Sequence, residues 1–202
     1  MARTKPIEPD AAAGDKSEKI LQGAMQEFLT HGYAGTSMDK VAKTGGVSKA
    51  TVYSYFQDKE GLFAALVQRL AKEKIYFTVM DEEPAVVLRF VATTILESTI
   101  QEPEFLAFVR LVIAESGRFP QLAQTYIRNL AKPGIERVAD YLASRQELKL
   151  PDPEATARIF IGSLVHFQLM QEMMHGKEIM PMERDRLIDA LLHLILSSQS
   201  NT

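Results

Sequence analysis

The chain has 202 residues, of which 46% are hydrophobic, and this is enough to bury a core in one large or two small domains. Its formal net charge is −3, so a nucleic-acid function would have to reside in a local patch. It contains no cysteine, which excludes disulfides, thiolate catalysis and cysteine-based metal sites. The N-terminal stretch lacks the apolar segment of a secretion signal, and the longest apolar-rich run, residues 159–170, is shorter than the ~20 residues of a membrane span. We therefore expect no membrane partner and a cytoplasmic location.

The first helix is predicted to follow a flexible tail. Residues 1–14 contain prolines, an alanine triplet and scattered charge, a composition typical of a tail. Asp15 and Glu18 then stand at the spacing of a capping box, and Gly32 is suited to end the helix. Apolar residues recur on one face of this segment: Ile20, Leu21, Ala24, Met25 and Phe28. This pattern predicts an amphipathic helix.

Two short helices joined by a tight turn are predicted next. Thr36 and Asp39 repeat the helix-start spacing, Gly46 can adopt the left-handed conformation of a sharp turn, and Ser48 is a good N-cap for a third helix. Each helix has its own apolar face: Met38, Val41 and Ala42 in the second, and Val52 and Phe56 in the third. The segment from about 37 to 56 therefore has the pattern of a helix-turn-helix motif.

The rest of the chain also has only helical patterns, so we predict an all-α protein of nine or ten helices. Asp58 caps a fourth helix, and the polar residues that end it place a domain boundary near residue 74. We therefore expect an N-terminal domain at 15–74 and a C-terminal domain at 75–202. Prolines divide the second domain into helices at about 84–101, 104–116, 119–131, 134–148, 153–175 and 182–198.

The last two of these helices are apolar over an unusually wide arc. A helix of this kind has two faces to bury, and a small domain can cover only one of them. We therefore predict a homodimer held by a four-helix bundle, two helices from each subunit. The expected interface residues are Phe160, Leu164, Phe167, Leu187, Leu191, Leu194 and Ile195.

The string TSMDKVAKTGGVSKATVYSYFQDKEGLF resembles the DNA-binding domain of the TetR family of bacterial transcriptional regulators, and the resemblance covers about residues 15–70. It rests on features at fixed offsets: Gly32-Tyr33, Thr36-Ser37, Val41-Ala42, Gly46-Val47-Ser48, Thr51, Tyr53, Tyr55-Phe56, Lys59 and Leu62-Phe63. Gly45 departs from the alanine that the family often has, which predicts a looser turn. The segment FVRLVIAESGRFPQLAQTYI is similar to the AefR-like C-terminal domains of that family.

The resemblance implies an operator DNA partner and a set of residues that contact it. The third helix would enter the major groove, where an ammonium at Lys49 can donate to guanine O6 and N7. Tyr53 and Tyr55 would bind phosphates, as would the starts of the second and fourth helices. The expected DNA-binding set is Thr36, Ser37, Ser48, Lys49, Ala50, Thr51, Tyr53, Ser54, Tyr55 and Lys59. Two such helices in a dimer imply a near-palindromic operator.

The family resemblance also implies a small-molecule effector that releases the protein from its operator. If apolar residues of the C-terminal helices line the pocket, the ligand is small and largely apolar. The expected lining is Phe105, Phe108, Val112, Glu115, His166, Phe167, Met170, Gln171 and Met174. The alternatives are a DNA-binding protein without an effector, and an activator in place of a repressor.

An enzyme is a poor interpretation of this sequence, which has no phosphate-binding glycine loop and no serine elbow. Glu172 and His175 have the spacing of helical di-metal ligands, but a second copy of that spacing is missing. We therefore expect no catalytic residue, no metal and no cofactor.

Overall fold

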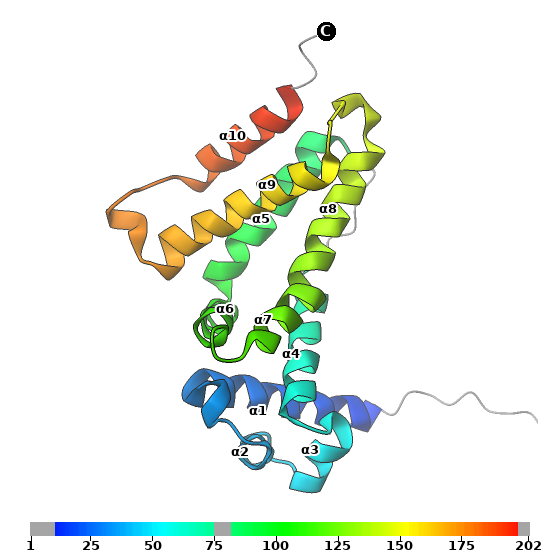
Figure 1. Cartoon of the computed structure of the whole chain (residues 1–202), viewed down its shortest axis with the longest axis vertical. Helices are drawn as coiled ribbons and strands as arrows, with labels where there is room; N and C mark the ends of the chain where they lie inside the picture. The colour runs from blue at the N-terminus through cyan, green and yellow to red at the C-terminus, as the bar shows by residue number, and fades with distance from the viewer. Residues whose placement is uncertain (1–10, 75–81, 198–202) are drawn as a thin grey trace, which may run out of the picture. The chain divides into compact units, whose positions relative to one another are not determined.

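The structure is a computed structural model that describes residues 11–74 and 82–197. Within these ranges it is built from helices and contains no strand, which confirms the all-α prediction (Figure 1). The described α-helices are α1 (Ala11–Gly35), α2 (Met38–Thr44), α3 (Lys49–Phe56), α4 (Lys59–Lys74), α5 (Pro84–Gln101), α6 (Pro103–Glu115), α7 (Pro120–Tyr126), α8 (Lys132–Ser144), α9 (Pro153–Gln168) and α10 (Arg184–Leu196). Short π-helical turns follow α7 and α9, namely η1 (Ile127–Ala131) and η3 (Leu169–Met173). Short 3-10 turns are η2 (Gln146–Leu148) and η4 (Gly176–Glu178).

The chain divides into two compact units, and the division falls within α4, between Leu66 and Val67. The boundary that we expected near residue 74 coincides with the end of this helix, but the helix itself contributes residues to both units. At the other end, α1 begins at Ala11, so residues 11–14 are helical and do not belong to a tail. The remainder of the predicted tail lies outside the described residues.

The start of α1 also corrects a predicted cap. Because the helix begins before Asp15, this residue lies inside the helix and cannot cap it. Its carboxylate instead binds the ammonium of Lys19 at 2.7 Å, one turn further along the helix. The predicted helix end at Gly32 is confirmed as a break, since this glycine has φ 70° and ψ 170°.

The N-terminal unit is organised around a cluster of three aromatic rings. The ring centroid of Phe28 in α1 lies 5.6 Å from that of Tyr33 and 5.8 Å from that of Phe63 in α4. All three side chains are buried, and Phe63 also meets Tyr33 edge-on at 5.8 Å. Edge-to-face aromatic pairs add to the stabilisation from apolar burial. The cluster therefore fixes the start of α4 against the end of α1, beside the helix-turn-helix motif.

The C-terminal unit is a helical bundle in which α9 packs between α5 and α8, while α10 packs on α5 (Figure 1). Its core comprises the buried residues Val87, Leu88, Val91, Ala92, Leu96, Val138, Tyr141, Leu142, Leu148, Ala157, Phe160, Leu164, Phe167, Ile188, Leu191, Leu192 and Ile195. Four of its helices, α5, α6, α7 and α9, begin with a proline, since proline fits the first turn of a helix, where its missing N–H is not needed. None of the described helices is long and apolar enough to cross a membrane.

Candidate functional site

The second helix of the motif begins one residue later than the sequence predicted. Ser37 is the N-cap of α2, and its hydroxyl accepts a hydrogen bond from the amide of Lys40 at 3.3 Å. Thr36 is only 3% exposed, and its hydroxyl is directed at the carbonyl oxygens of Gly32 at 2.8 Å and Glu27 at 3.0 Å. The expectation that the Thr36 side chain contacts a phosphate therefore does not hold, because this hydroxyl is buried between α1 and α2. Ser37 is exposed.

The turn between α2 and α3 depends on two glycines with different roles. Gly46 has φ 64°, the left-handed conformation expected for the turn. Gly45 has a helical φ of −76°, and its backbone lies against α1. A Cβ atom on Gly23 of α1 would be 2.8 Å from the amide nitrogen of Gly45, and a Cβ atom on Gly45 would be 3.0 Å from the carbonyl oxygen of Lys19 in α1. Both glycines therefore allow α1 to pack closely on the turn, whereas the looser turn that we expected from Gly45 stays a prediction.

Helix α3 buries one face and exposes the other, as the sequence predicted. The hydroxyl of Ser48 accepts a hydrogen bond from the amide of Thr51 at 3.1 Å, which confirms Ser48 as the N-cap. Val52 is fully buried, whereas Tyr53 is 43% exposed and Tyr55 is 36% exposed. The exposed set also includes Ser48, Lys49, Ala50 and Ser54. The outward face of α3 thus carries amine, hydroxyl, methyl and phenol groups.

Lys49 is paired with an acidic residue of the preceding helix. Its ammonium nitrogen lies 2.8 Å from Oδ1 and 2.9 Å from Oδ2 of Asp39, and both side chains are 60% exposed. The hydrogen bond to Asp39 and the charge of that carboxylate hold the pKa of Lys49 above its usual value. The same ammonium lies 5.8 Å from the centroid of the Tyr53 ring. The sequence identifies Asp39 only as a helix-start residue, because a contact with a residue ten positions away leaves no trace in the local pattern.

Lys59 also has partners within the N-terminal unit. Its ammonium donates to the carbonyl oxygens of Tyr33 at 2.8 Å and Thr36 at 3.1 Å, and it lies 4.3 Å from the centroid of the Tyr33 ring. The N-cap of α4 is Asp58, as predicted, with its carboxylate accepting from the amide of Gly61 at 2.7 Å. Lys59 therefore joins three helix ends, a role that we did not expect from the sequence.

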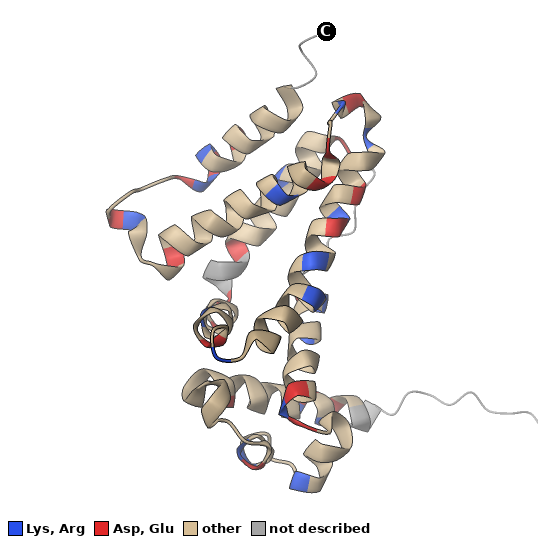
Figure 2. Cartoon of the chain, in the orientation of Figure 1, with Lys and Arg blue, Asp and Glu red and all other residues tan. Residues whose placement is uncertain are grey.

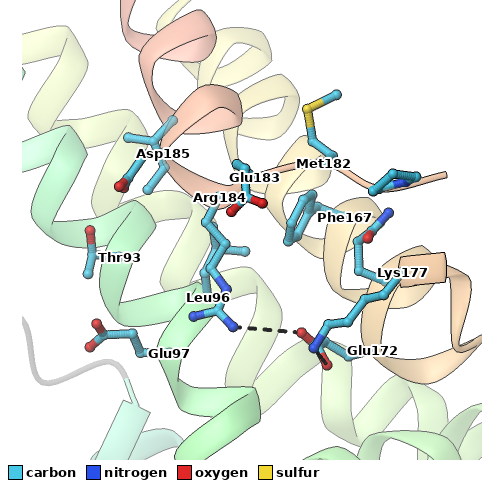
Figure 3. A pocket seen from close by; sticks show the side chains of 13 residues that line it. Thr93, Leu96, Glu97, Phe167, Glu172, Lys177, Met182, Glu183, Arg184 and Asp185 are labelled. Atoms are coloured by element: carbon cyan, nitrogen blue, oxygen red, sulfur yellow. Dashed lines mark ion pairs between the residues drawn. The ribbon is translucent and has the colours of Figure 1, made fainter.

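Two cavities in the C-terminal unit share part of their lining, which comprises Phe167, Gln171, Pro181 and Met182. The first cavity has a volume of about 520 Å³ and lies among α5, the end of α9 and the start of α10 (Figure 3). Its other lining residues are Thr93, Leu96, Glu97, Glu172, Lys177, Glu183, Arg184, Asp185 and Ile188. The second has a volume of about 600 Å³, and its other lining residues are Arg158, Ile159, Gly162, Ser163, His166, Met170, Met180 and Leu187.

The two cavities differ in charge. Figure 3 shows Lys177 and Arg184 directed toward Glu172 at the first cavity, with nitrogen-to-oxygen distances of 2.8 Å and 3.9 Å. Further carboxylates line this cavity, whereas the described lining of the second cavity is mainly apolar and includes a single charged residue, Arg158. The second cavity therefore suits the largely apolar ligand that the sequence predicts better than the first.

Four of the nine expected pocket residues line these cavities. Phe167 and Gln171 line both, and His166 and Met170 line the second. The other five line neither cavity: Phe105, Phe108, Val112, Glu115 and Met174. Four of these five lie on α6, which borders neither cavity, and Met174 is exposed. Within the described part of the chain, no three His, Asp or Glu side chains are grouped closely enough to hold a metal ion.

The predicted dimer residues fall into two groups. Five of them are buried in the core of their own subunit, so they are not available to a partner: Phe160, Leu164, Phe167, Leu191 and Ile195. Leu194 is 69% exposed, and Leu187 is partly buried. On α9, the exposed apolar positions are instead Ile159, which is 66% exposed, and Val165. Figure 2 shows that most of α9 and the second half of α10 carry no Lys, Arg, Asp or Glu.

These features define a two-unit helical protein whose N-terminal unit carries a helix-turn-helix motif with a polar, exposed third helix. This is the architecture of a DNA-binding transcriptional regulator. Residues 20–66 match the family model for bacterial regulatory proteins of the tetR family, and residues 86–198 match the C-terminal domain of AefR-like transcriptional repressors. The chain therefore belongs to the TetR family and has an AefR-like C-terminal domain. Members of this family are transcription regulators, so the chain is not an enzyme.

Known relatives agree with this assignment. The HTH-type transcriptional regulator YhgD of Bacillus subtilis, described as uncharacterized, is 42% identical over 59 residues, which are 29% of this chain and 31% of that protein. The HTH-type transcriptional regulator AcrR of Shigella flexneri is 27% identical over 146 residues, or 68% of this chain and 67% of that protein. Among solved structures, the flavonoid-responsive regulator FrrA has a TM-score of 0.71 and 29% identity, over 92% of this chain and 97% of that chain.

Proposed function

We propose that this regulator is a repressor that binds a near-palindromic operator as a homodimer and is released by a small, largely apolar ligand. The observation that carries the DNA-binding part is the two-sided character of α3, which buries Val52 and exposes Lys49, Tyr53 and Tyr55. In a helix-turn-helix protein the exposed face of this helix enters the major groove. Repression is supported by the match of the C-terminal unit to AefR-like repressors.

In the proposed complex, Lys49 reads a base edge and the two tyrosines bind the backbone. An ammonium at the start of α3 can donate to guanine O6 and N7, which are exposed only in the major groove. The phenols of Tyr53 and Tyr55 can donate to phosphate oxygens, which positions the helix without reading sequence. Ser37 and the N-terminal amides of α2 offer a further phosphate contact, since helix N-termini attract anions. Ala50, Thr51 and Ser54 add methyl and hydroxyl contacts.

The homodimer would form through the exposed faces of α9 and α10. Ile159, Gly162 and His166 lie three or four positions apart along α9, and all three are exposed. Ala190 and Leu194 lie four positions apart on α10 and are exposed too. A second copy of the same two helices would cover these faces in a four-helix bundle, which is the usual way to bury apolar helix faces of this kind.

The effector would occupy the second cavity, whose volume of about 600 Å³ and mainly apolar lining suit a drug-sized molecule. Three of its lining residues, Ile159, Gly162 and His166, belong to the proposed dimer face, so an occupant of this cavity would also affect the contact between the subunits. A ligand shifts a protein between two states only by its different affinity for them, and here the states differ in the arrangement of the two DNA-binding units. The similarity to a flavonoid-responsive regulator supports a response to small molecules.

Selection of bound sites from random double-stranded DNA tests the proposal. The purified full chain is expected to enrich a near-palindrome whose half-sites lie about one helical turn, roughly 34 Å, apart. Light scattering of the same preparation is expected to give twice the mass of one chain at micromolar concentration. Failure to enrich any site, or a monomer bound to a single half-site, would refute the operator-binding homodimer. An enriched palindrome with no small molecule able to release it would leave a regulator without an effector.

A further inference from the structure

An acidic side chain lies on the surface that is proposed to meet DNA. Asp39 is in the first turn of α2, it is exposed, and its carboxylate binds the ammonium of Lys49 in α3. A carboxylate close to a phosphate backbone weakens DNA binding by charge repulsion. Asp39 is therefore expected to lower the affinity for DNA of any sequence, at a surface where a positive charge would raise that affinity.

The geometry of the pair holds the lysine in one direction. A single ammonium nitrogen lies 2.8 Å and 2.9 Å from the two carboxylate oxygens of Asp39, and the Tyr53 ring centroid is 5.8 Å away on the side of α3. Lysine has a flexible stem and a compact charge, so on its own it would bind any nearby phosphate. Held between Asp39 and Tyr53, the ammonium keeps N–H groups that can donate to another acceptor.

We propose that Asp39 is a specificity-determining residue that acts through Lys49. This inference rests on the proposed function, in which Lys49 reads a base in the major groove. The carboxylate orients the ammonium toward the base edge, and its negative charge lowers the attraction of the ammonium to phosphates. The lysine therefore distinguishes guanine from the other bases and contributes less to the binding of DNA of any sequence. Asp39 is a positioning residue in this arrangement and makes no base contact of its own.

A double-mutant cycle separates this role from simple charge repulsion. The variants are Asp39→Asn, Lys49→Met and the two combined, each measured by fluorescence anisotropy on three DNAs. The first DNA is the operator found by selection, and the third is random DNA. The second is the operator changed at one base pair, the one at which Lys49→Met loses most of the preference that the wild-type chain shows. Asp39→Asn keeps the size of the side chain and leaves the Ser37 cap of α2 in place, so the helix is retained.

Asp39→Asn is expected to lower the discrimination at this base pair by about fivefold, since an exposed ion pair rarely contributes more. Its affinity for random DNA is expected to stay the same or to increase. In the Lys49→Met background, Asp39→Asn is expected to change the discrimination no further. As a matched control, Asp15→Asn removes the carboxylate of another exposed Lys–Asp pair, with Lys19 on α1, and is expected to leave the discrimination unchanged.

The outcomes distinguish this inference from the proposed function. If Asp39→Asn alters affinity for the three DNAs by the same factor, or if its effect persists when Lys49 is methionine, Asp39 does not act through Lys49 and the inference is wrong. If Lys49→Met changes no base preference, the inference is also wrong, while operator binding stands on the enriched site. If the wild-type chain enriches no site at all, the proposed function itself fails.

Discussion

The ammonium of Lys59 binds the carbonyl oxygen of Tyr33 at 2.8 Å and lies 4.3 Å from the centroid of the ring of the same residue. It also donates to the carbonyl oxygen of Thr36 at 3.1 Å. One side chain at the start of α4 thus holds the end of α1 and the residue that precedes the Ser37 cap of α2. Its cation thus binds backbone oxygens at the end of α1 and directly before α2, and it helps to hold these helices against the start of α4.

Lys59→Met is therefore expected to destabilise the folded chain by about 1–2 kcal/mol, because it removes charged hydrogen bonds to backbone oxygens. Urea unfolding followed by circular dichroism measures this change. The matched control is Lys72→Met, which removes an exposed lysine of the same helix and is expected to cost less than about 0.5 kcal/mol. If Lys59 instead contacts a phosphate, Lys59→Met would leave the free energy of unfolding nearly unchanged. It would then lower the slope of log affinity for DNA against log salt concentration by about one.

A second prediction concerns the phenols of α3. Tyr53→Phe and Tyr55→Phe each remove one hydroxyl from an exposed ring, and each is expected to weaken binding to operator and to random DNA by the same factor, about threefold to tenfold. Fluorescence anisotropy on both DNAs measures the two factors. A loss confined to the operator would show that the phenol reads a base, and no loss on either DNA would exclude the tyrosine from the interface.

Local patterns in the sequence were sufficient for the helices and for two of their caps. The prolines at positions 84, 120 and 153 start helices because their fixed φ suits the first turn. Ser48 and Asp58 accept hydrogen bonds from amides three residues further on, as a cap requires. Each of these features depends on residues within one turn, so the sequence contains all the information that decides them.

Contacts between distant segments were the part that could not be predicted. Thr36 and Ser37 both have hydroxyls suited to a cap, and the choice between them follows from the carbonyl oxygen of Glu27, nine positions earlier. Likewise, the wide apolar arc of α9 is visible in the sequence, but only packing on α5 and α8 decides that Phe160 is buried and Ile159 exposed. The same limit applies to the phenylalanines of α6, which line neither of the two cavities, since apolar spacing is alike in a core and in a cavity.

The close approach of α1 to the turn of the motif gives a third prediction. Gly23→Ala places a methyl group 2.8 Å from the amide nitrogen of Gly45, and neither backbone can move aside easily. We expect a loss of about 1–3 kcal/mol in the free energy of unfolding, together with weaker DNA binding. Gly14→Ala is the control in the same helix, where nothing lies within 4 Å of the new methyl group. It is expected to raise stability by about 0.5–1 kcal/mol, because alanine is the better helix former. Equal effects of the two substitutions would contradict the packing account.

The proposed dimer face gives a fourth prediction. Leu194→Glu introduces a charge at an exposed position of α10, where a four-helix bundle would bury it against a second copy. The variant is expected to be monomeric at micromolar concentration by light scattering and to lose most of its operator affinity, because a single half-site remains. Ile127→Glu is the matched control, an exposed apolar residue outside α9 and α10. It is expected to remain a dimer, and a dimeric Leu194→Glu variant would place the subunit contact elsewhere.

The final prediction concerns the loop that borders both cavities. Met182 is exposed and lines each of them, so Met182→Trp is expected to fill cavity space without disturbing the core. Small molecules that raise the melting temperature of the wild-type chain in a thermal-shift screen should then lose most of that shift, because stabilisation by a ligand depends on its concentration relative to its Kd. Met174→Trp is the control, since Met174 is also an exposed methionine of the same connection and lines neither cavity. Its response to the same compounds is expected to match the wild type. Compounds that stabilise the Met182→Trp variant as well as the wild type would bind elsewhere, and the effector would then have no place in these two cavities.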